Sequence, residues 1–296
     1  MKRMILLAAA AISVGMLFGC NDEGTKDTQE LSAQVTVSEE ITAETETETT
    51  TQAPPEVLPT YENADNFDNT LYGWYFMANG NHERPGMPNE HNIDFKKYYT
   101  YGMGSEDEKV IYLTFDEGYE NGYTEQILNT LKEKNVPAAF FVTGYFLDQR
   151  PDLVKRMVDE GHIVGSHSVN HYSSPELSKE EFDSEILDLE NSFKEKIGAD
   201  MPHYFRPPRG EYSERTLALA NNLGYKNIFW SYAHRDWLVD DQPDPTESTN
   251  NIVNSAHNGE ILLLHAVSKT NSDILGDVID KIRNEGYEFK SLDELK

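Results

Sequence analysis

The stretch "IYLTFDEGYENG", residues 111–122, decides how the rest of the chain is interpreted. A β-prone apolar run leads directly into two adjacent carboxylates, Asp116 and Glu117, and then into glycines. A strand normally ends in a single polar turn residue, so a pair of acids on a rigid strand needs partners elsewhere in the chain. Those partners are expected to be ionisable residues at the ends of further strands.

Seven β-prone runs alternate with helical segments along residues 110–296. The predicted strands lie near residues 110–115, 138–143, 162–166, 203–206, 227–232, 260–264 and 287–290. Helix boundaries are indicated by Pro151 and Gly161, by the capping pair Ser178 and Glu181, and by Gly224 and Gly286. Apolar strands that alternate with helices predict an α/β fold with a parallel sheet covered on both faces. Seven such units favour a barrel, although the spacing is also compatible with an open sheet.

Ionisable side chains follow five of the seven predicted strands. They are Asp116 with Glu117, His167, Arg206, Asp236 and His265. Each one alone could be an ordinary loop residue or a structural histidine. In β/α barrels, however, the C-terminal ends of the strands carry the chemistry. The recurrence of ionisable groups at these ends therefore indicates an active site.

His167 and His171 are four residues apart, in "GSHSVNHYSSP". If this segment forms one helical turn, both imidazoles face the same way, which is a metal-ligand spacing. A carboxylate from a neighbouring strand would complete a two-histidine, one-carboxylate site with open positions. Such a metal lowers the pKa of bound water and polarises a carbonyl. One acid at residues 116–117 would then bind the metal, and the other would act as a general base.

Five ordered motifs resemble those of a known family. They are "TFDEG", "HSVNH", "RPPRG", "RDW" and "LLLH", and they run from about residue 110 to the C-terminus. Their order and spacing resemble the polysaccharide deacetylases, the NodB-homology group that forms carbohydrate esterase family 4. The resemblance implies a distorted (β/α)7-type barrel with one divalent metal ion, zinc or another divalent transition metal.

The resemblance also implies a role for each motif residue. Asp116 is the expected base that deprotonates metal-bound water, and Arg206 is expected to hold Asp116 ionised. His265 is the expected acid for the leaving amine. The expected metal ligands are Glu117, His167 and His171. Arg209, the first residue after two prolines to carry a backbone N–H, is expected to bind the oxyanion.

Two positions depart from the family pattern. Glu117 stands where the family usually has aspartate, which places its ligand role in doubt. Ala233 occupies a position that is often an aspartate, which leaves Asp236 either to serve His265 or to play a purely structural part.

A further likeness, carried by "FDEGYENGYT", "RPPRG" and "GWYFMANGNHERP", is to the delta-lactam-biosynthetic de-N-acetylases. It implies hydrolysis of N-acetyl groups on N-acetylmuramic acid in peptidoglycan. The alternatives are a deacetylase of N-acetylglucosamine polymers and an esterase that removes O-acetyl groups from a xylan-type glycan. A third is a non-catalytic wall-binding lipoprotein, which would be expected to lose a base, a metal histidine or the acid.

The N-terminal residues predict export. Two basic residues precede an apolar run that ends at Cys20, the single cysteine of the chain. This pattern resembles a bacterial lipoprotein signal over residues 1–19, with Cys20 lipidated at the outer face of the cell membrane. A plain secretory signal or an N-terminal anchor is the alternative. With one cysteine, the chain has no internal disulfide.

Charge and composition divide the remaining residues. The chain carries a net charge of −27, of which residues 21–60 contribute −9 and residues 61–296 contribute −20. Residues 20–60 are rich in Thr and Glu and predict a disordered tether. Residues 61–108 are expected to pack on the barrel, and residues 109–296 to form the catalytic domain. The negative charge argues against nucleic acid as a partner. We expect a monomer that works on the glycan strand of the wall.

Overall fold

The computed structural model describes residues 57–88 and 91–296. The predicted signal peptide, Cys20 and most of the predicted tether lie outside the described residues. All of the described residues belong to one compact unit. Within the described part of the chain, no helix is both long enough and apolar enough to cross a membrane.

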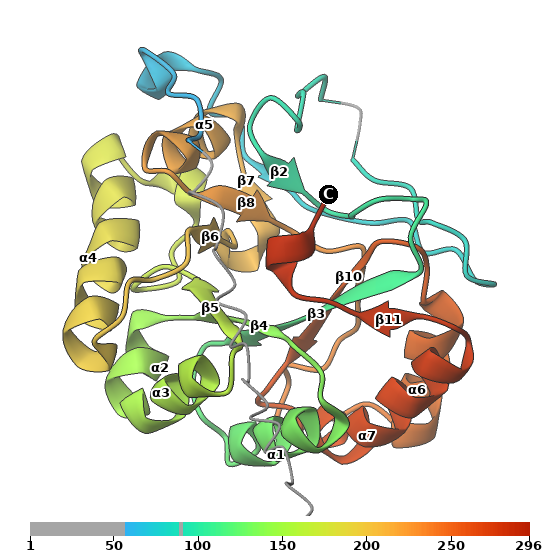
Figure 1. The fold of residues 1–296 in the computed structure, drawn as a ribbon. Coiled ribbons are helices and arrows are strands. Elements are labelled where there is room, and N and C mark those ends of the chain that lie inside the picture. The colour runs from blue at the N-terminus through green and yellow to red at the C-terminus, as the bar shows by residue number, and fades with distance from the viewer. Residues whose placement is uncertain (1–56, 89–90) are drawn as a thin grey trace, which may run out of the picture. The chain divides into compact units, whose positions relative to one another are not determined.

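A parallel sheet surrounded by helices forms the centre of this unit (Figure 1). The strands of the whole unit are β1 (Tyr72–Gly73), β2 (Thr100–Tyr101), β3 (Val110–Glu117), β4 (Ala139–Val142), β5 (Ile163–Ser166), β6 (Tyr204–Phe205), β7 (Glu211–Tyr212), β8 (Lys226–Ile228), β9 (Tyr232–Ala233), β10 (Glu260–His265) and β11 (Glu288–Phe289). Of these, β1 and β7 pair with each other, antiparallel, in a separate two-stranded sheet. The helices are α1 (Thr124–Lys134), α2 (Gly144–Gln149), α3 (Pro151–Asp159), α4 (Lys179–Ile197), α5 (Glu214–Asn222), α6 (Pro245–Ser255) and α7 (Lys269–Asn284). Short 3-10 turns cover Ala64–Asn66, Ser174–Glu176, Pro208–Gly210 and Leu292–Glu294.

The strand order confirms the predicted distorted (β/α)7-type barrel. Neighbouring strands run β2-β8-β6-β5-β4-β3-β10-β9, and β11 pairs with the first residues of β3. All pairs in this sheet are parallel. The predicted strand at residues 227–232 is two strands, β8 and β9, which lie towards opposite ends of the order. Residues 229–231 join them, so the main chain itself closes the ring.

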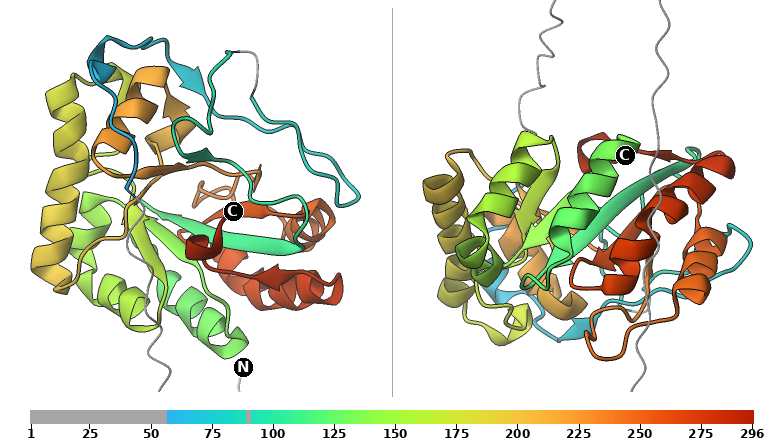
Figure 2. Two further views of the ribbon diagram at one scale, coloured as in Figure 1. Left: turned by 45° about the horizontal axis from the view of Figure 1, so that its top comes forward. Right: turned by 90° about the horizontal axis from the view of Figure 1, so that it is seen from below.

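The predicted helix boundaries are confirmed. Pro151 is the first residue of α3, and Gly161 follows that helix with a φ of +82°. Ser178 and Glu181 form the reciprocal hydrogen bonds of a capping box at the start of α4. Pro151 lacks the N–H that would have no partner at the start of α3, and the capping box supplies partners for two backbone N–H groups at the start of α4. These local signals determine where the helices begin and end. The helices themselves lie around the outside of the strands, as Figure 2 shows.

The core lies between the strands and the helices. Its largest cluster joins β3, β4 and β10 to α1, α3 and α7 through buried aliphatic and aromatic side chains, among them Leu113, Phe140 and Leu262. A second cluster lies beneath residues 61–108, where Trp74 stacks on Phe229 with ring centroids 4.1 Å apart. The Trp74 indole N–H also donates to the backbone oxygen of Trp230 at 2.8 Å. The N-terminal segment is therefore packed against the residues that close the ring.

Candidate active site

A pocket of about 490 Å3 opens where the parallel strands end. Its lining residues are Asp116, Gly118, Tyr119, His167, His171, Arg209, Gly210, Trp230, Ala233, Trp237, Leu263, His265 and Val267. Asp116 and His265 are paired in register on the adjacent strands β3 and β10. The pocket therefore brings together the predicted base, the predicted acid and both predicted metal histidines.

Asp116 is held by a buried guanidinium. Arg206 is fully buried, and its Nη1 donates to Asp116 Oδ1 at 2.8 Å. Burial alone would raise the pKa of Asp116, but the positive charge of Arg206, aided by His167, outweighs burial and lowers the pKa below its ordinary value. Asp116 is therefore ionised at neutral pH, as a general base must be.

The two neighbouring acids point to opposite sides of β3. Successive side chains alternate across a strand, and Asp116 lines the pocket whereas Glu117 does not. Glu117 is fully buried, and its Oε2 accepts a long hydrogen bond of 3.5 Å from Thr124 at the start of α1. Burial, followed by the nearby charge of Glu120, raises the pKa of Glu117 well above its ordinary value. The structure therefore does not bring Glu117 to the histidines, and its predicted ligand role finds no support in this geometry.

His167 and His171 face each other without forming a helical turn. Residues 167–171 are an irregular loop in which Ser168 and His171 have φ values of 66° and 59°. The ring centroids are nevertheless 4.8 Å apart. The helical turn that the spacing allowed is absent, and two left-handed residues produce the convergence instead.

The protonation of the two histidines suits metal binding. His167 Nδ1 donates to the backbone oxygen of Arg206 at 2.8 Å, which leaves Nε2 as the acceptor, 3.5 Å from Asp116 Oδ2. Burial lowers the pKa of His167, and burial together with His167 lowers that of His171 to about 4. Both rings are neutral at pH 7 and carry free lone pairs. Among the described residues no group of three or more His, Cys, Asp or Glu side chains is arranged to hold a metal ion.

The loop that carries these histidines is tied to α4 by Glu185, which the sequence analysis did not single out. Its carboxylate accepts the backbone N–H of Asn170 at 2.7 Å and the Asn170 side-chain amide at 2.6 Å. Its backbone oxygen accepts the N–H of Val169 at 3.0 Å. Left-handed backbone at residues other than glycine costs of order 1–3 kcal/mol. These bonds offset that cost and hold the loop.

His265, the predicted acid, is paired with a carboxylate. His265 Nδ1 donates to Asp236 Oδ1 at 2.7 Å, and the His265 backbone N–H donates to Asp236 Oδ2 at 2.8 Å. Asn271, on α7, donates its side-chain amide to the same Oδ2 at 2.5 Å. Burial alone would lower the pKa of His265, but the charge of Asp236 and its hydrogen bond outweigh burial and raise it. Asp236 therefore acts on His265, and Ala233 lines the pocket without a polar group.

Comparisons with known proteins agree with this geometry. Residues 103–228 match the family model described as polysaccharide deacetylase. The chain is 41% identical over 236 residues to the peptidoglycan-N-acetylmuramic acid deacetylase PdaA of Bacillus subtilis, covering 78% of this chain and 88% of that protein. The chain belongs to the polysaccharide deacetylase family. It is 33% identical over 193 residues to a peptidoglycan-N-acetylglucosamine deacetylase of Bacillus cereus, covering 64% of this chain and 88% of that protein.

The fold comparison leads to the same family. The solved structure of Bacillus subtilis PdaA, a family 4 carbohydrate esterase, superposes with a TM-score of 0.74 at 39% identity, covering 77% of this chain and 97% of that chain. This protein, as a polysaccharide deacetylase, is thus an enzyme that hydrolyses amide bonds. Its fold is a (β/α) barrel of the family type.

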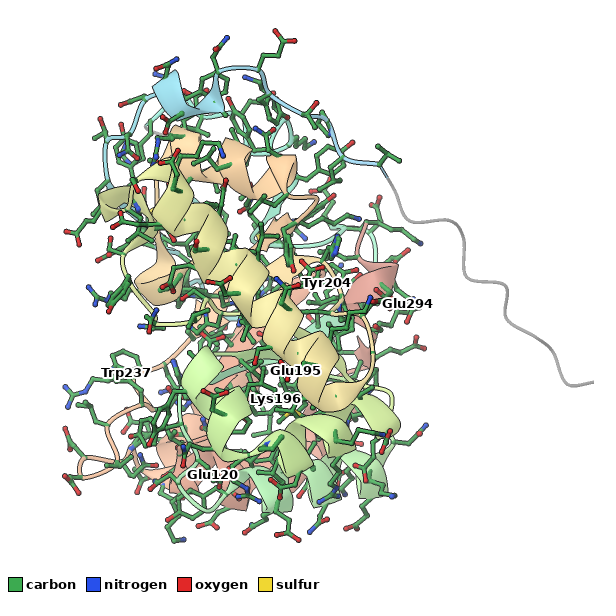
Figure 3. All side chains as sticks on the ribbon, turned by 90° about the vertical axis from the view of Figure 1, so that its left-hand side faces the viewer. Glu120, Glu195, Lys196, Tyr204, Trp237 and Glu294 are labelled. Atoms are coloured by element: carbon green, nitrogen blue, oxygen red, sulfur yellow. The ribbon has the colours of Figure 1, made fainter. Side chains whose placement is uncertain are left out.

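The loop anchor can be tested by changing Glu185. Glu185→Ala leaves both donors of Asn170 without their partner, and we expect activity to fall at least tenfold. Glu185→Gln keeps one acceptor oxygen and should lose less. Hydrogen bonds to charged groups contribute about 1.5–3 kcal/mol, so the melting temperature should fall too. Glu195→Ala, an exposed site on the same helix (Figure 3), is the control. A lower melting temperature with unchanged kcat would show that the loop is held by other contacts.

The Asp236–His265 pair predicts a shift in pH dependence. An acid must be protonated, so the rate falls as pH rises through the raised pKa of His265. Asp236→Asn removes the charge that raises this pKa, and the alkaline limb of the kcat/KM profile should move to lower pH, while kcat falls by about 10²–10⁴-fold. Asp241→Asn, an equal charge change at an exposed position of the same loop, is the control. If both variants shift the limb equally, the effect is not specific to this pair.

Proposed function

We propose that this chain is a metal-dependent peptidoglycan deacetylase that acts on N-acetylmuramic acid. The observation that carries the proposal is one pocket lined by an ionised Asp116, two neutral imidazoles and the carboxylate-paired His265. The similarity to the N-acetylmuramic acid deacetylase supports the choice of sugar. The freed amine would lie on the same sugar as the lactyl carboxylate, and these are the two groups from which a muramic delta-lactam forms.

The donor set fits a divalent cation in part. His167 Nε2 and His171 offer free lone pairs to the pocket and would hold the ion, with other positions left to water and substrate. A zinc ion or another divalent transition metal, when bound there, would lower the pKa of water and polarise the substrate carbonyl. Glu117 is omitted from this set because its carboxyl group lies on the other side of β3.

The protein groups divide the reaction between them. Asp116 accepts a proton from a water molecule while the oxygen of that water attacks the acetyl carbonyl carbon. The backbone N–H of Arg209, the first after two prolines, donates to the oxygen that becomes negative. His265 then delivers its proton to the nitrogen as the C–N bond breaks. The products are acetate and the free amino sugar.

The same proposal includes a location. The relatives named for peptidoglycan imply action outside the cell. We propose that lipidation of Cys20 anchors the enzyme to the outer face of the membrane and that residues 20–60 act as its tether. The enzyme would then reach the wall as a monomer.

Metal dependence predicts linked losses of binding and activity. Chelation should abolish turnover, and a divalent cation should restore it. His167→Ala and His171→Ala should each lower metal affinity at least tenfold, measured by equilibrium dialysis. Glu117→Gln is the matched comparison and should keep both metal affinity and turnover, because the Glu117 side chain lies on the other side of β3 from the pocket. Full turnover in an exhaustively metal-free preparation would contradict the mechanism. Loss of metal in Glu117→Gln would instead return Glu117 to the ligand set.

Selectivity for muramic acid depends on Arg209 in this proposal. Arg209 lines the pocket and has a φ of 58°. Its guanidinium can bind the lactyl carboxylate of a peptide-free muramic acid through two parallel hydrogen bonds, which lysine cannot copy. Wild-type enzyme should remove one acetyl group per modified muramic acid from bare glycan strands, as read by mass spectrometry.

The variant Arg209→Tyr keeps the backbone donor and tests the preference. It should lower kcat/KM on muramic-acid glycans by roughly ten- to a hundredfold, which corresponds to the free energy of a charge-assisted hydrogen bond. On N-acetylglucosamine oligomers kcat/KM should fall far less. For Arg209→Lys, kcat/KM on muramic-acid glycans should lie between the values of the wild type and of Arg209→Tyr. An equal loss on both substrates would mean that Arg209 does not recognise the lactyl group. Wild-type preference for N-acetylglucosamine would favour the alternative suggested by the Bacillus cereus relative.

A further inference from the structure

Arg209, whose backbone N–H is the proposed oxyanion donor, lies in a strained turn of residues 207–210, the Arg209 turn. Arg209 and Gly210 have φ values of 58° and 65°, so two successive residues have left-handed backbone. Such backbone is unfavourable at a residue other than glycine and persists only where the surroundings hold it. Within the turn, the N–H of Gly210 donates to the backbone oxygen of Pro207 at 3.0 Å. The direction of the Arg209 N–H therefore depends on contacts from elsewhere in the chain.

The N-terminal segment supplies hydrogen bonds to the Arg209 turn. β1 pairs antiparallel with β7, the two residues that directly follow the turn. At the next position, the backbone N–H of Trp74 donates to the backbone oxygen of Gly210 at 2.8 Å. The main chain that follows Arg209 is thus tied at successive residues to a segment that is distant in the sequence.

Close packing also fixes the Arg209 turn. Gly210 lies between two tryptophans, where a Cβ atom would be 2.7 Å from the ring of Trp230 and 3.2 Å from the Cβ of Trp74. The first of these distances is too short for two carbon atoms, so a larger residue does not fit without a shift of its neighbours. The backbone of Gly210 therefore has little room to move towards either tryptophan.

Trp74 is itself held firmly. Its ring stacks on Phe229 with centroids 4.1 Å apart and meets Phe95 edge-on at 5.4 Å. The indole N–H donates to the backbone oxygen of Trp230 at 2.8 Å. The backbone also approaches the ring closely at Gly102, where a Cβ atom would lie 2.3 Å from the indole. A ring enclosed in this way keeps one orientation, and the main chain that carries it is fixed as well.

We propose that Trp74 is a positioning residue for deacetylation, which holds the Arg209 turn so that the Arg209 N–H points at the developing oxyanion before the reaction begins. Trp74 does not line the catalytic pocket and acts through the turn. It lies outside residues 103–228, the part of the chain that matches the family model. The inference rests on the proposed function for the role of the Arg209 N–H. A donor fixed in advance stabilises the oxyanion without a cost of rearrangement.

Trp74→Phe tests the inference with a small change, because phenylalanine keeps a ring on Phe229 and loses the indole N–H. The substrate is bare peptidoglycan strands or, if these are not turned over, N-acetylglucosamine hexasaccharide. An oxyanion donor acts in the transition state, so kcat should fall about three- to tenfold while KM stays within about twofold. Trp74→Leu also loses the stacking and should lower kcat about ten- to a hundredfold, towards the loss of a whole donor.

Amide hydrogen exchange reports on the Arg209 turn directly. It is read by mass spectrometry on peptides that cover residues 209–212 of the metal-loaded enzyme. In Trp74→Phe, exchange there should become at least about threefold faster, because the turn opens more often. Tyr287→Phe is the matched control, since Tyr287 is buried away from the catalytic pocket and donates to the backbone oxygen of Ala256 at 3.0 Å. It should lower the melting temperature by a similar amount and leave kcat and this exchange unchanged.

Three results would overturn the inference. An equal fall of kcat in Tyr287→Phe would show that lost stability explains the effect. A rise in KM that accounts for the whole loss of kcat/KM in Trp74→Phe would place the damage in glycan binding. Wild-type values of both kcat and exchange in Trp74→Phe would show that Trp74 does not hold the turn. The Trp74→Phe result decides if Trp74→Leu fails to fold.

The outcome is separable from that of the proposed function. Faster exchange at residues 209–212 with unchanged kcat would overturn the positioning role and show that the fault lies in the choice of the Arg209 N–H as oxyanion donor. Conversely, N-acetylglucosamine hexasaccharide contains no muramic acid. A lower kcat of Trp74→Phe on this substrate, with unchanged KM and faster exchange, supports the positioning role even if the preference for muramic acid fails.

Discussion

The contact between Arg206 and Asp116 is the interaction on which the rest of the structure depends. The fully buried guanidinium joins the end of β6 to the end of β3, and it also donates to the backbone oxygens of Ile228 and Phe229, where the ring closes. The backbone oxygen of Arg206 fixes the ring nitrogen of His167. A buried charge without its partner costs several kcal/mol. One residue therefore couples closure of the barrel, ionisation of the proposed base and orientation of a proposed metal ligand.

The proposed catalytic groups are held in position by hydrogen bonds from two different parts of the fold. On one side, Glu185 of α4 holds the loop of His167 and His171 in a strained backbone conformation. On the other, Asp236 and Asn271 hold His265 through short hydrogen bonds from a loop and from α7. Preorganised groups of this kind need no rearrangement as charge develops in the reaction. The helices thus contribute to the chemistry although none of the proposed acid, base or metal ligands lies on one.

The outer rim of the pocket carries large aromatic side chains that are exposed. Trp237 is 48% exposed beside His265, and Tyr119, which also lines the pocket, is 42% exposed. Large exposed side chains beside a reaction centre lose little by remaining in water and gain when a ligand covers them. This distribution accords with membership of a family that acts on polysaccharides.

The sequence alone determined the α/β class, the seven strand regions, several helix ends and the identity of most pocket residues, because these depend on local patterns and on five ordered motifs. It did not determine which of Asp116 and Glu117 enters the pocket. That depends on which face of β3 is turned towards the pocket and which towards α1. Nor did it reveal that residues 227–232 form two strands, or that Glu185 and Asn271 support the site. Those features depend on contacts between residues distant in the chain, such as the bond from Asn271 to Asp236. No local pattern encodes them, because only packing of the whole barrel brings these groups together.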